Sequence, residues 1–368
     1  MPNFLFVCGG TAGHINPALA IADELRGVMP DAKILFVGSG RDLENRLIPN
    51  AGYKLVNIKM TGLQRGFSPE KLVHNIKTAK HLITAGAEAG RIIREFKPDA
   101  VIGTGAYVCY PVLKKAARMG IPTFIHEQNA VPGLANKLLS ASVDKVLVSF
   151  PGLEKQFKRP ERVVFTGTPV RGEFIAEQKG RQNLKPLVVS FWGSLGAAHM
   201  NEVMAEFIKR NIDESAFDHI HATGGKRSNV DEMIIRLENL VAPTALPQGI
   251  QIREYIDDMP SVMASADIVL CRAGATTIAE LTVLGKPAML VPSPNVTNNQ
   301  QEENAKQLQK SGGAVMILEK DCTGEKLYDA VLALLKDKEK LKSMSEAQKA
   351  LGAPNAARKI VELIIDVC

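Results

Sequence analysis

The feature that most constrains the fold is a unit that occurs twice in the chain. Each copy, at residues 4–25 and 187–208, has a short apolar run, a glycine-rich turn and a helical pattern. The turn GTAG (10–13) of the first copy corresponds to GSLG (193–196) of the second, about 183 residues later. A strand that leads through glycines into a helix is typical of doubly wound α/β folds that bind nucleotides. We therefore predict two Rossmann-like domains, with the cleft between them as the default ligand site.

The length and the regular alternation of elements support this prediction. A chain of 368 residues is long for a single core. Helical and strand patterns alternate along all of it, which favours the α/β class. The pattern restarts near residues 165–171, so we predict a first domain at 1–165 and a second at 166–352. The connecting segment is expected to be a hinge that closes on a ligand.

Polar groups follow two successive predicted strands in the stretch 266–305. Thr276 and Thr277 are predicted to cap a helix that carries Glu280 one turn in. An amide-rich loop at 298–301 follows the next strand. Free N–H groups at a helix N-terminus suit a phosphate, and a carboxylate can accept hydrogen bonds from both hydroxyls of a ribose. The stretch therefore predicts a nucleotide or nucleotide-sugar pocket.

The first half carries a similar turn but lacks one mark of a dehydrogenase. Glycines at 9–13 let the backbone turn tightly, with Thr11 as the expected helix cap and His14 at the mouth of the turn. The second strand, at 33–37, ends without the acid that holds the ribose of a dinucleotide, which argues against a nicotinamide cofactor. The last strand of this half is predicted at 145–149.

Composition narrows the class of protein further. The net charge of +6 is uneven: through residue 165 there are 22 basic and 13 acidic residues, against 23 and 26 in the remainder. A basic first half favours an anionic partner, which can be a phosphate, a nucleic acid or a membrane surface. The 5 cysteines are scattered, which predicts neither a disulfide framework nor a zinc site and favours a reducing cytoplasm. Residues 4–8 are too short for a signal peptide, and no apolar run of about 18 residues predicts a membrane span.

Eight short motifs carry a resemblance to a known family. They are GGTAGHINPALA (9–20), GTGAYVCYP (103–111), HEQNAVPGLANK (126–137), GTPVR (167–171), GSLGA (193–197), YIDDM (255–259), CRAGATTIAEL (271–281) and NNQQEENA (298–305). The ordered set spans nearly the whole chain. It resembles the MurG family, the undecaprenyl-diphospho-muramoyl-pentapeptide β-N-acetylglucosaminyltransferases, whose two Rossmann-like domains face a cleft in the GT-B arrangement.

The resemblance implies a reaction. N-acetylglucosamine would pass from UDP-GlcNAc to the C4 hydroxyl of the muramoyl sugar of lipid I, with inversion, and give lipid II for peptidoglycan synthesis. No metal ion and no other cofactor are implied. The enzyme would lie on the cytoplasmic face of the bacterial cell membrane as a peripheral protein. A C-terminal helix at 353–368 would cross back to the first domain.

The resemblance also implies roles for individual residues. The implied donor contacts are Ser194, Ile256, Ala275, Thr276, Thr277, Glu280 and Gln301, with Arg171 from the hinge and Thr11, Ala12, Gly13 and Asn129 from the first domain. The implied acceptor side comprises Gly105, Tyr107, His126 and Gln128. His14 is the first choice of general base and Glu127 the second. The N-terminus of the first helix disfavours an imidazolium, which would keep His14 neutral and able to accept a proton.

A membrane surface is the third implied partner, besides UDP-GlcNAc and lipid I. The mixed apolar and basic stretch at 72–94, aided by Lys114, Lys115 and Arg118, is predicted to hold the first domain to anionic lipid. The alternative is an ordinary surface helix, within a helical stretch at 71–96, whose apolar side faces the sheet. A further Lys-rich amphipathic helix is predicted at 325–349.

The chain departs from the family pattern at three places. Trp192 stands where the family usually has the first glycine of a GGS turn, and Thr168 replaces a common Asn. The loop before Gln301 has Pro294 and Asn298 where family members often have other residues, frequently an Asp at the second position.

Two other functions stay open. Another UDP-sugar transferase of the GT-B type, or a UDP-GlcNAc 2-epimerase, would use the same fold, and an assay of UDP-GlcNAc alone would detect the epimerase. A non-catalytic binder of anionic lipid or nucleic acid is the other alternative. An aromatic content of only 5% argues against single-strand binding.

Overall fold

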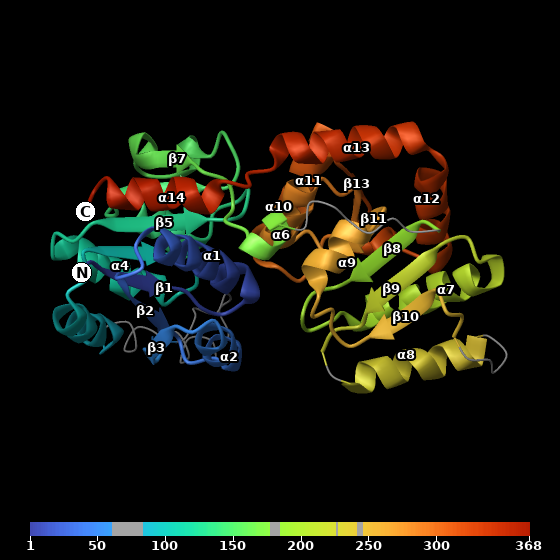
Figure 1. The fold of residues 1–368 in the computed structure, drawn as a ribbon, viewed down its shortest axis with the longest axis horizontal. Coiled ribbons are helices and arrows are strands. Elements are labelled where there is room, and N and C mark those ends of the chain that lie inside the picture. Colours follow the sequence, from blue (N-terminus) through green and yellow to red (C-terminus); the bar gives the residue numbers. More distant parts are fainter. Residues whose placement is uncertain (61–83, 177–184, 226, 241–245) are drawn as a thin grey trace, which may run out of the picture. The chain divides into compact units, whose positions relative to one another are not determined.

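A computed structural model describes residues 1–60, 84–176, 185–225, 227–240 and 246–368, and these form two compact units (Figure 1). Unit 1 comprises Met1–Arg171 with Ala353–Cys368, and unit 2 comprises Gly172–Gly352. Each unit has one parallel β-sheet with helices on its faces, which confirms the predicted α/β fold class. The division falls after Arg171 rather than after residue 165. The segment past 165 stays on the first sheet, because Thr166 N–H donates to Val148 O at 3.0 Å.

The sheet of unit 1 has seven parallel strands in the order β3-β2-β1-β4-β5-β6-β7. Their bounds are β1 Asn3–Val7, β2 Lys33–Gly38, β3 Lys54–Asn57, β4 Ala100–Gly103, β5 Thr123–Glu127, β6 Lys145–Val148 and β7 Val163–Phe165. The prediction that the strand at 145–149 is the last of this half was wrong, since β7 pairs beyond it. The strand order reverses between β1 and β4, and this topological switch point is where such sheets bind ligands.

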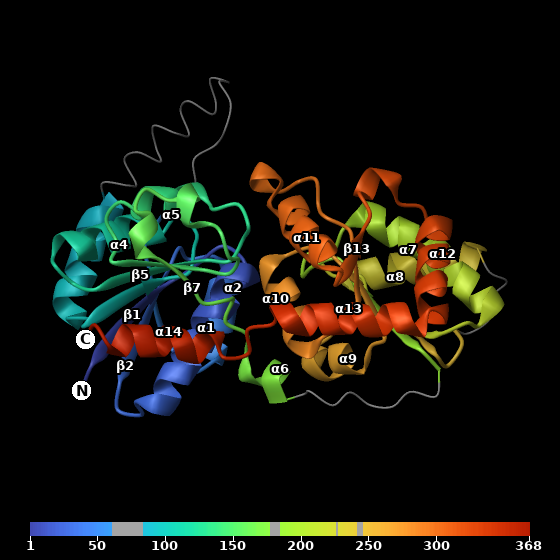
Figure 2. The same cartoon turned by 90° about the horizontal axis from the view of Figure 1, so that it is seen from above.

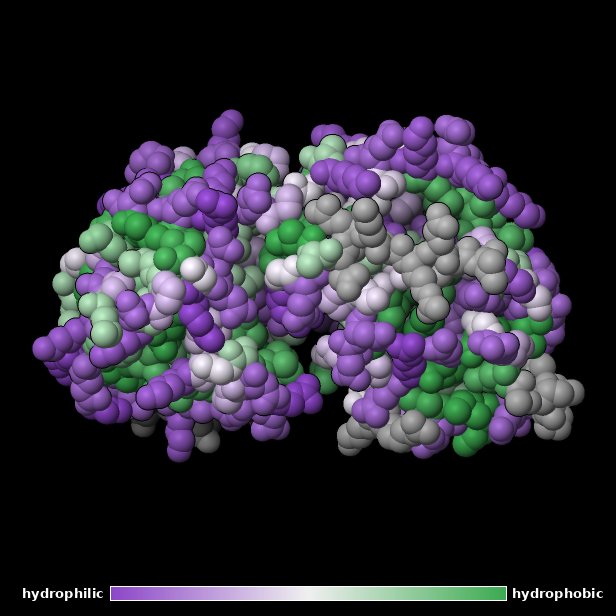
Figure 3. Space-filling view, in the orientation of Figure 1, coloured by the Kyte–Doolittle hydropathy of each residue, from purple (hydrophilic) through white to green (hydrophobic). Residues whose placement is uncertain are grey.

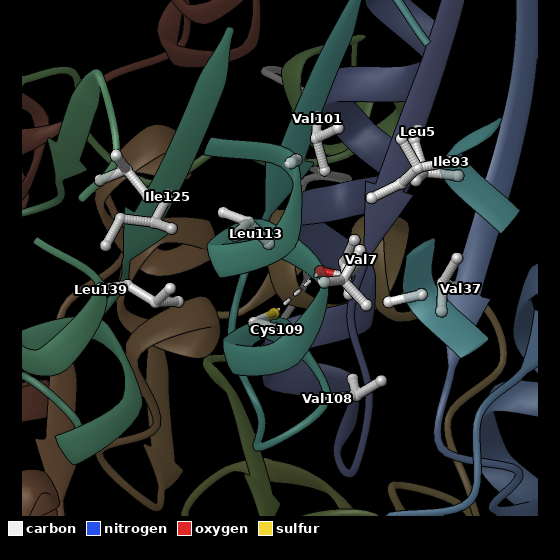
Figure 4. Packing of buried hydrophobic residues seen from close by; sticks show 14 of the residues in the cluster. Leu5, Val7, Val37, Ile93, Val101, Val108, Cys109, Leu113, Ile125 and Leu139 are labelled. Atoms are coloured by element: carbon white, nitrogen blue, oxygen red, sulfur yellow. Dashed lines mark hydrogen bonds between the residues drawn. The ribbon is translucent and has the colours of Figure 1, made fainter. Parts of the chain in front are cut away.

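Helices cover both faces of this sheet. They are α1 Ala12–Val28, α2 Asp42–Asn50, a helix over 84–96, α4 Cys109–Arg118, α5 Leu134–Leu139 and α14 Ala356–Ile365, with 3₁₀ turns η1 Glu154–Gln156 and η2 Pro160–Arg162. Successive strand residues point to opposite faces. Phe4 and Phe6 therefore pack with α1 and α14. Leu5 and Val7 pack with α4, α5 and the helix over 84–96, and the Cys109 thiol donates to Val7 O at 3.2 Å (Figure 4).

The C-terminal helix belongs to unit 1. Both views show α14 beside α1 (Figures 1 and 2), and its Ile360, Val361 and Ile364 are buried in the same core as Phe4. The predicted return of the C-terminal helix to the first domain is confirmed. The helix itself begins at Ala356, three residues after the predicted start at 353.

Unit 2 repeats the arrangement with six parallel strands in the order β10-β9-β8-β11-β12-β13. Their bounds are β8 Leu187–Phe191, β9 Asp218–Ala222, β10 Ile250–Arg253, β11 Ile268–Cys271, β12 Ala288–Leu290 and β13 Ala314–Met316. The strand order reverses between β8 and β11. The second switch point therefore lies at the carboxyl ends of these two strands.

The helices of unit 2 include one correction. They are α6 Gly172–Ala176, α7 Ala198–Glu214, α8 Arg227–Leu240, α9 Met259–Ser265, α10 Ala275–Leu284, α11 Gln300–Ser311, α12 Gly324–Lys336 and α13 Lys338–Leu351, with 3₁₀ turns η3 Thr297–Asn299 and η4 Glu319–Asp321. The single helix predicted at 325–349 was wrong. It is two helices, because the Asp337 side chain accepts a hydrogen bond from Lys340 N at 2.9 Å and caps α13. Hydrophilic side chains cover α13 (Figure 3).

The predicted membrane stretch lies largely outside the described residues. Of the helix expected at 71–96, the part at 84–96 is described, and the segment 72–83 is not. In the described part at 84–96, Ile92 and Ile93 face the core of unit 1 rather than the surface. Among the residues that the structure does describe, no helix is both long enough and apolar enough to cross a bilayer.

Candidate active site

In each unit many of the site residues predicted from the sequence lie at or next to the strand ends that flank the switch point. In unit 1 the turn 9–13 follows β1, the loop 104–107 follows β4, and the loop 128–133 follows the neighbouring β5. In unit 2 the turn 193–197 follows β8, and the segment 272–277 follows β11. Parallel strands bring these segments to one edge of each sheet.

A buried glutamate holds the glycine turn of unit 1. The Glu44 carboxylate, on α2, accepts hydrogen bonds from the backbone N–H of Gly10 at 2.7 Å, Ser39 at 2.6 Å and Gly40 at 2.9 Å, and from the Ser39 hydroxyl at 2.6 Å. It ties the turn after β1 to the turn after β2. A Cβ at Gly9 would lie 2.6 Å from Glu44 Oε1, so glycine is needed there. The sequence analysis missed Glu44, because it looked for an acid at the end of β2 and not one turn into the next helix.

The residues after this turn begin α1. Thr11 is the N-cap and is exposed, as predicted, although its side chain makes no capping hydrogen bond. Ala12 and Gly13 are half-buried in the first turn of the helix. The N-terminus of α1 therefore lies at this edge of the sheet, where its dipole suits an anionic ligand.

His14 lies against the loop that follows β4. Its ring packs on Gly105, where a Cβ would collide with Nδ1, so only glycine fits there. The backbone of His14 is held as well, because the Thr104 hydroxyl donates to His14 O at 2.7 Å. Burial lowers the pKa of His14 below its ordinary value, and the negative charge of Glu127 opposes the shift. The lowered pKa favours a neutral ring at pH 7, and its main cause is burial rather than the helix N-terminus of the prediction.

His126 and Gln128 are both buried, so their side chains are directed into unit 1 and not to its surface. His126 Nε2 lies 2.9 Å from Gly167 O, and Gln128 Nε2 lies 3.1 Å from His126 Nδ1. Gln128 Nε2 also donates to Thr104 O at 2.6 Å. Burial lowers the pKa of His126 to about 4. These side chains form an internal network that links three strand ends.

Glu127 is also buried, and its carboxylate is fully occupied. Oε1 accepts from the backbone and side-chain nitrogens of Asn129 at 3.0 and 3.1 Å. Oε2 accepts from Gly133 N and Asn136 Nδ2, both at 2.9 Å. Four donors leave little capacity for a further proton, so Glu127 shapes the loop that presents Asn129. Tyr107, on the neighbouring loop, is 44% exposed and can contact a ligand.

The glycine turn of unit 2 is held by backbone contacts instead. Gly225 N–H donates to Ser194 O at 3.0 Å, and Gly196 N–H donates to Gly193 O at 3.0 Å. A Cβ at Gly224 would lie 2.6 Å from Gly193 O, so the two glycine turns after β8 and β9 interlock. Ser194 is exposed on this turn, at the N-terminal end of α7.

Trp192, which stands in place of the first glycine of the family's GGS turn, is buried in the core of unit 2. The guanidinium of Arg272 lies 5.8 Å from the centre of its ring. Arg272 Nη1 also bonds Glu319 Oε2 at 2.7 Å and Val291 O at 3.1 Å. Arg272 therefore joins the ends of β8, β11 and β12. Its pairing with Glu319, 47 residues away, could not be read from the sequence.

The helix after β11 begins one residue earlier than its predicted caps. Gly274 is the N-cap of α10, and Ile278 N–H donates to Gly274 O at 2.9 Å. The prediction that Thr276 and Thr277 cap this helix was wrong, since both lie in its first turn. Their position leaves the N–H groups of that turn directed beyond the end of β11. Glu280 follows one turn later and is half-buried.

The other predicted donor residues lie on separate elements. Gln301, at the start of α11, accepts from Ser293 N at 2.8 Å and so fixes the loop after β12. Ile256 is buried after β10, so a ligand there would meet its backbone. Ala275 is the first residue of α10, and Arg171 is the last residue of unit 1.

Comparison with known proteins identifies the family. The N-terminal domain of glycosyltransferase family 28 matches residues 4–148, and the C-terminal domain of that family matches residues 187–360. A relative from Acetivibrio thermocellus is 46% identical over 98% of this chain and 96% of its own. It is named UDP-N-acetylglucosamine--N-acetylmuramyl-(pentapeptide) pyrophosphoryl-undecaprenol N-acetylglucosamine transferase. This chain belongs to the MurG family of glycosyltransferases.

Solved structures agree with membership of the MurG family. The crystal structure of MurG from Acinetobacter baumannii is 28% identical, with a TM-score of 0.75 and coverage of 99% of this chain and 100% of that one. A putative UDP-N-acetylglucosamine 2-epimerase from Listeria monocytogenes has a TM-score of 0.69 over 98% of this chain and 95% of its own, but only 12% identity. The epimerase therefore shares the fold, and the resemblance read from the eight motifs is confirmed.

Proposed function

We propose that this enzyme transfers N-acetylglucosamine from UDP-GlcNAc to the C4 hydroxyl of the muramoyl sugar of lipid I and so forms lipid II. The observation that carries the proposal is the 46% identity, over nearly the full length of both chains, with a relative named for this transfer. The epimerase alternative has support from the fold alone.

Unit 2 binds the donor in this proposal. The N-terminal turn of α10, with Ala275, Thr276 and Thr277, and the turn with Ser194 before α7 offer backbone N–H groups to the diphosphate. Glu280 accepts hydrogen bonds from the two ribose hydroxyls. Ile256 and Gln301 complete the contacts. As the bond between the sugar C1 and the phosphate oxygen breaks, UDP leaves with the electron pair, and these N–H groups together with Arg171 stabilise its charge.

Unit 1 binds the acceptor and supplies the base. The acceptor C4 oxygen attacks C1 from the face opposite UDP, which inverts the configuration. Its proton passes to His14, since a hydroxyl of high pKa needs a base as it attacks. Gly105 and Tyr107 flank the acceptor, and the turn at Thr11, Ala12 and Gly13 reaches the donor together with Asn129. Glu127 positions Asn129 and is the second candidate for the base.

The membrane is the remaining partner. The undecaprenyl chain of lipid I stays in the bilayer, so unit 1 must reach the surface as a peripheral protein of the cytoplasmic face. The excess of basic residues in the first half favours anionic lipid.

The experiment that tests the function has two arms. Purified enzyme is incubated with UDP-GlcNAc and lipid I in one arm and with UDP-GlcNAc alone in the other. Formation of lipid II and UDP in the first arm, and no 2-epimerised sugar in the second, is the expected result. Turnover of UDP-GlcNAc to its epimer without acceptor would overturn the proposal in favour of the epimerase.

A further inference from the structure

We propose that Gln128 is a positioning residue that holds His14 in the tautomer with its proton on Nδ1, which leaves the Nε2 lone pair for the acceptor hydroxyl. This inference rests on the proposed function, in which His14 is the base. Gln128 does not touch substrate, because its side chain is buried beneath the strand ends.

Hydrogen bonds fix the orientation of the Gln128 amide. Its Nε2 donates to Thr104 O at 2.6 Å and lies 3.1 Å from His126 Nδ1. His126 Nε2 lies 2.9 Å from Gly167 O, which can only accept, so the His126 proton is on Nε2 and its Nδ1 accepts. Burial lowers the pKa of His126 to about 4, which keeps the ring neutral and Nδ1 an acceptor at pH 7. If the amide were flipped, Oε1 would face Thr104 O and His126 Nδ1, and neither atom could donate a hydrogen bond to it.

Two buried atoms, Gln128 Oε1 and His14 Nδ1, can form an acceptor–donor pair. Gln128 Oε1 and His14 Nδ1 are both enclosed, and neither has a hydrogen bond of regular geometry to any residue in the described part of the chain. The Nδ1 edge of His14 faces Gly105, next to the Thr104 carbonyl that Gln128 already binds. Oε1 can only accept, whereas Nδ1 can carry a proton. A hydrogen bond from Nδ1–H to Oε1 would satisfy both atoms.

The electrostatics of His14 agree with this pairing. Burial lowers the pKa of His14, while the charge of Glu127, the contact with Gln128 and the Thr104 backbone each oppose that shift. An acceptor beside an imidazole N–H has this effect, because it stabilises the protonated form. His126, the other titratable neighbour, is neutral. The amide thus orients the ring without adding a second buried charge beside Glu127.

The consequence is chemical. A neutral imidazole has one N–H and one lone pair, and the bond made by one nitrogen decides which of the two remains for the other. With Nδ1–H held by Gln128, Nε2 has the lone pair and can take the acceptor proton. Without Gln128 the two tautomers compete, and part of the enzyme presents an N–H to the hydroxyl instead of a base.

The tautomer can be measured directly. Long-range ¹H–¹⁵N spectra of the imidazole rings report which nitrogen carries the proton, and His14→Ala assigns the signal among the 7 histidines. We expect Nδ1–H for His14 in the wild type and a shift toward Nε2–H in Gln128→Met. Gln128→Glu keeps an acceptor oxygen toward Nδ1, and as the protonated acid it can still donate to Thr104 O or His126 Nδ1, so in that form it should retain the wild-type tautomer. An Nε2–H signal in the wild type, or an unchanged Nδ1–H signal in Gln128→Met, would overturn the proposal.

Kinetics separate this inference from the proposed function. Gln128→Met should lower kcat with the KM for UDP-GlcNAc unchanged, and by less than the roughly 10⁴-fold that the wrong tautomer of a catalytic histidine costs, because the two tautomers compete. Gln128→Glu should stay within about tenfold of the wild type. If Gln128→Met does not fold, the tautomer of His14 is measured in Gln128→Glu instead. Loss of the Nδ1–H tautomer in Gln128→Glu would contradict the proposed role of Oε1. If His14→Ala keeps full kcat, the proposed base is wrong, whereas the tautomer measurement still tests Gln128.

Discussion

The two units share a strand order around the switch point but bury their polar side chains in different places. In unit 1 they gather at the strand ends, where Glu44, Glu127 and Gln128 brace the loops around His14. Unit 2 also buries a polar cluster within its strands, although Asn304 Nδ2 braces the end of β11 by donating to Ala273 O at 3.2 Å. Ser190 on β8 bonds His219 Nε2 at 2.8 Å and His221 Nδ1 at 2.7 Å on β9, below a strand end that carries glycines and an exposed serine.

This difference fits a division of labour on one fold. Proton transfer needs a titratable group whose position and tautomer are fixed by neighbours, and unit 1 supplies such neighbours at its switch point. Binding of a diphosphate needs mainly free backbone N–H groups, which unit 2 offers from a turn held by its own backbone. The following predictions test whether the two regions differ in this way.

The largest effect is expected at His14. His14→Ala should lower kcat by about 10²–10⁴-fold, the usual contribution of a general base, with donor binding little changed. Steady-state kinetics with both substrates varied is the measurement. Glu127→Ala is the comparison, and it should mainly lower the melting temperature, since its four donors lose their acceptor. A near-normal kcat for His14→Ala beside a lost kcat for Glu127→Ala would reverse the assignment.

The counterpart in unit 2 is Glu280. Glu280→Ala removes two charge-assisted hydrogen bonds to the ribose, so the KM for UDP-GlcNAc should rise about 100-fold, and kcat at saturation should change much less. Glu339→Ala, which removes an exposed glutamate from α13 of the same unit, is the matched control. An unchanged KM for Glu280→Ala would mean that this carboxylate does not bind the ribose.

Glu44 tests whether the turn of unit 1 depends on one buried charge. Glu44→Gln weakens charge-assisted bonds from three backbone N–H groups and should lower the free energy of unfolding by about 2 kcal/mol. In unit 2, Asn229 donates to Gly224 O at 2.7 Å in the corresponding place, and Asn229→Ala should cost only about 1 kcal/mol. Urea denaturation measures both, and Asp42→Asn, an exposed neighbour of Glu44, is the control. Equal losses of unfolding free energy for Glu44→Gln and Asn229→Ala would show that the turn of unit 1 does not depend more on one side chain than the turn of unit 2.

The buried histidines of unit 2 should make its stability depend on pH. Burial lowers the pKa of His221 to about 3, below its ordinary value of 6.5. The unfolded chain therefore binds the proton first as the pH falls below 6.5, and stability is lost on acidification. At pH 5.5 this group costs about 1.4 kcal/mol relative to pH 7. His221→Asn keeps a partner for Ser190 and should remove that difference, while His199→Asn, an exposed histidine, should not.

The sequence predicted what is local and repeated. The two strand–glycine–helix units, their parallel sheets and the motif residues at the strand ends are encoded within a few residues of each other. Strands β7 and β13, with three residues each, were not predicted from the sequence. The break at Asp337 lies within a continuous Lys-rich amphipathic run. Glu44 reaches Gly10 across 34 residues, and such contacts leave no periodic signal.

The remaining contrast is expected at the membrane, where the two halves of the chain differ in charge. The first half has an excess of 9 basic residues through residue 165 (22 against 13), while the remainder has an excess of 3 acidic ones (26 against 23). Attraction to anionic lipid is worth about 1 kcal/mol for each basic residue near the surface, so vesicles with anionic lipid should bind the enzyme more tightly than neutral ones, and salt should weaken the binding.

Within the described residues, Lys114, Lys115 and Arg118 on α4 are the candidates for contact with anionic lipid. A triple change to Gln should reduce sedimentation with anionic vesicles, whereas the same change at Lys338, Lys340 and Lys342 on α13 should not. Equal binding to both kinds of vesicle at low salt would show that charge does not distinguish the two units at a membrane.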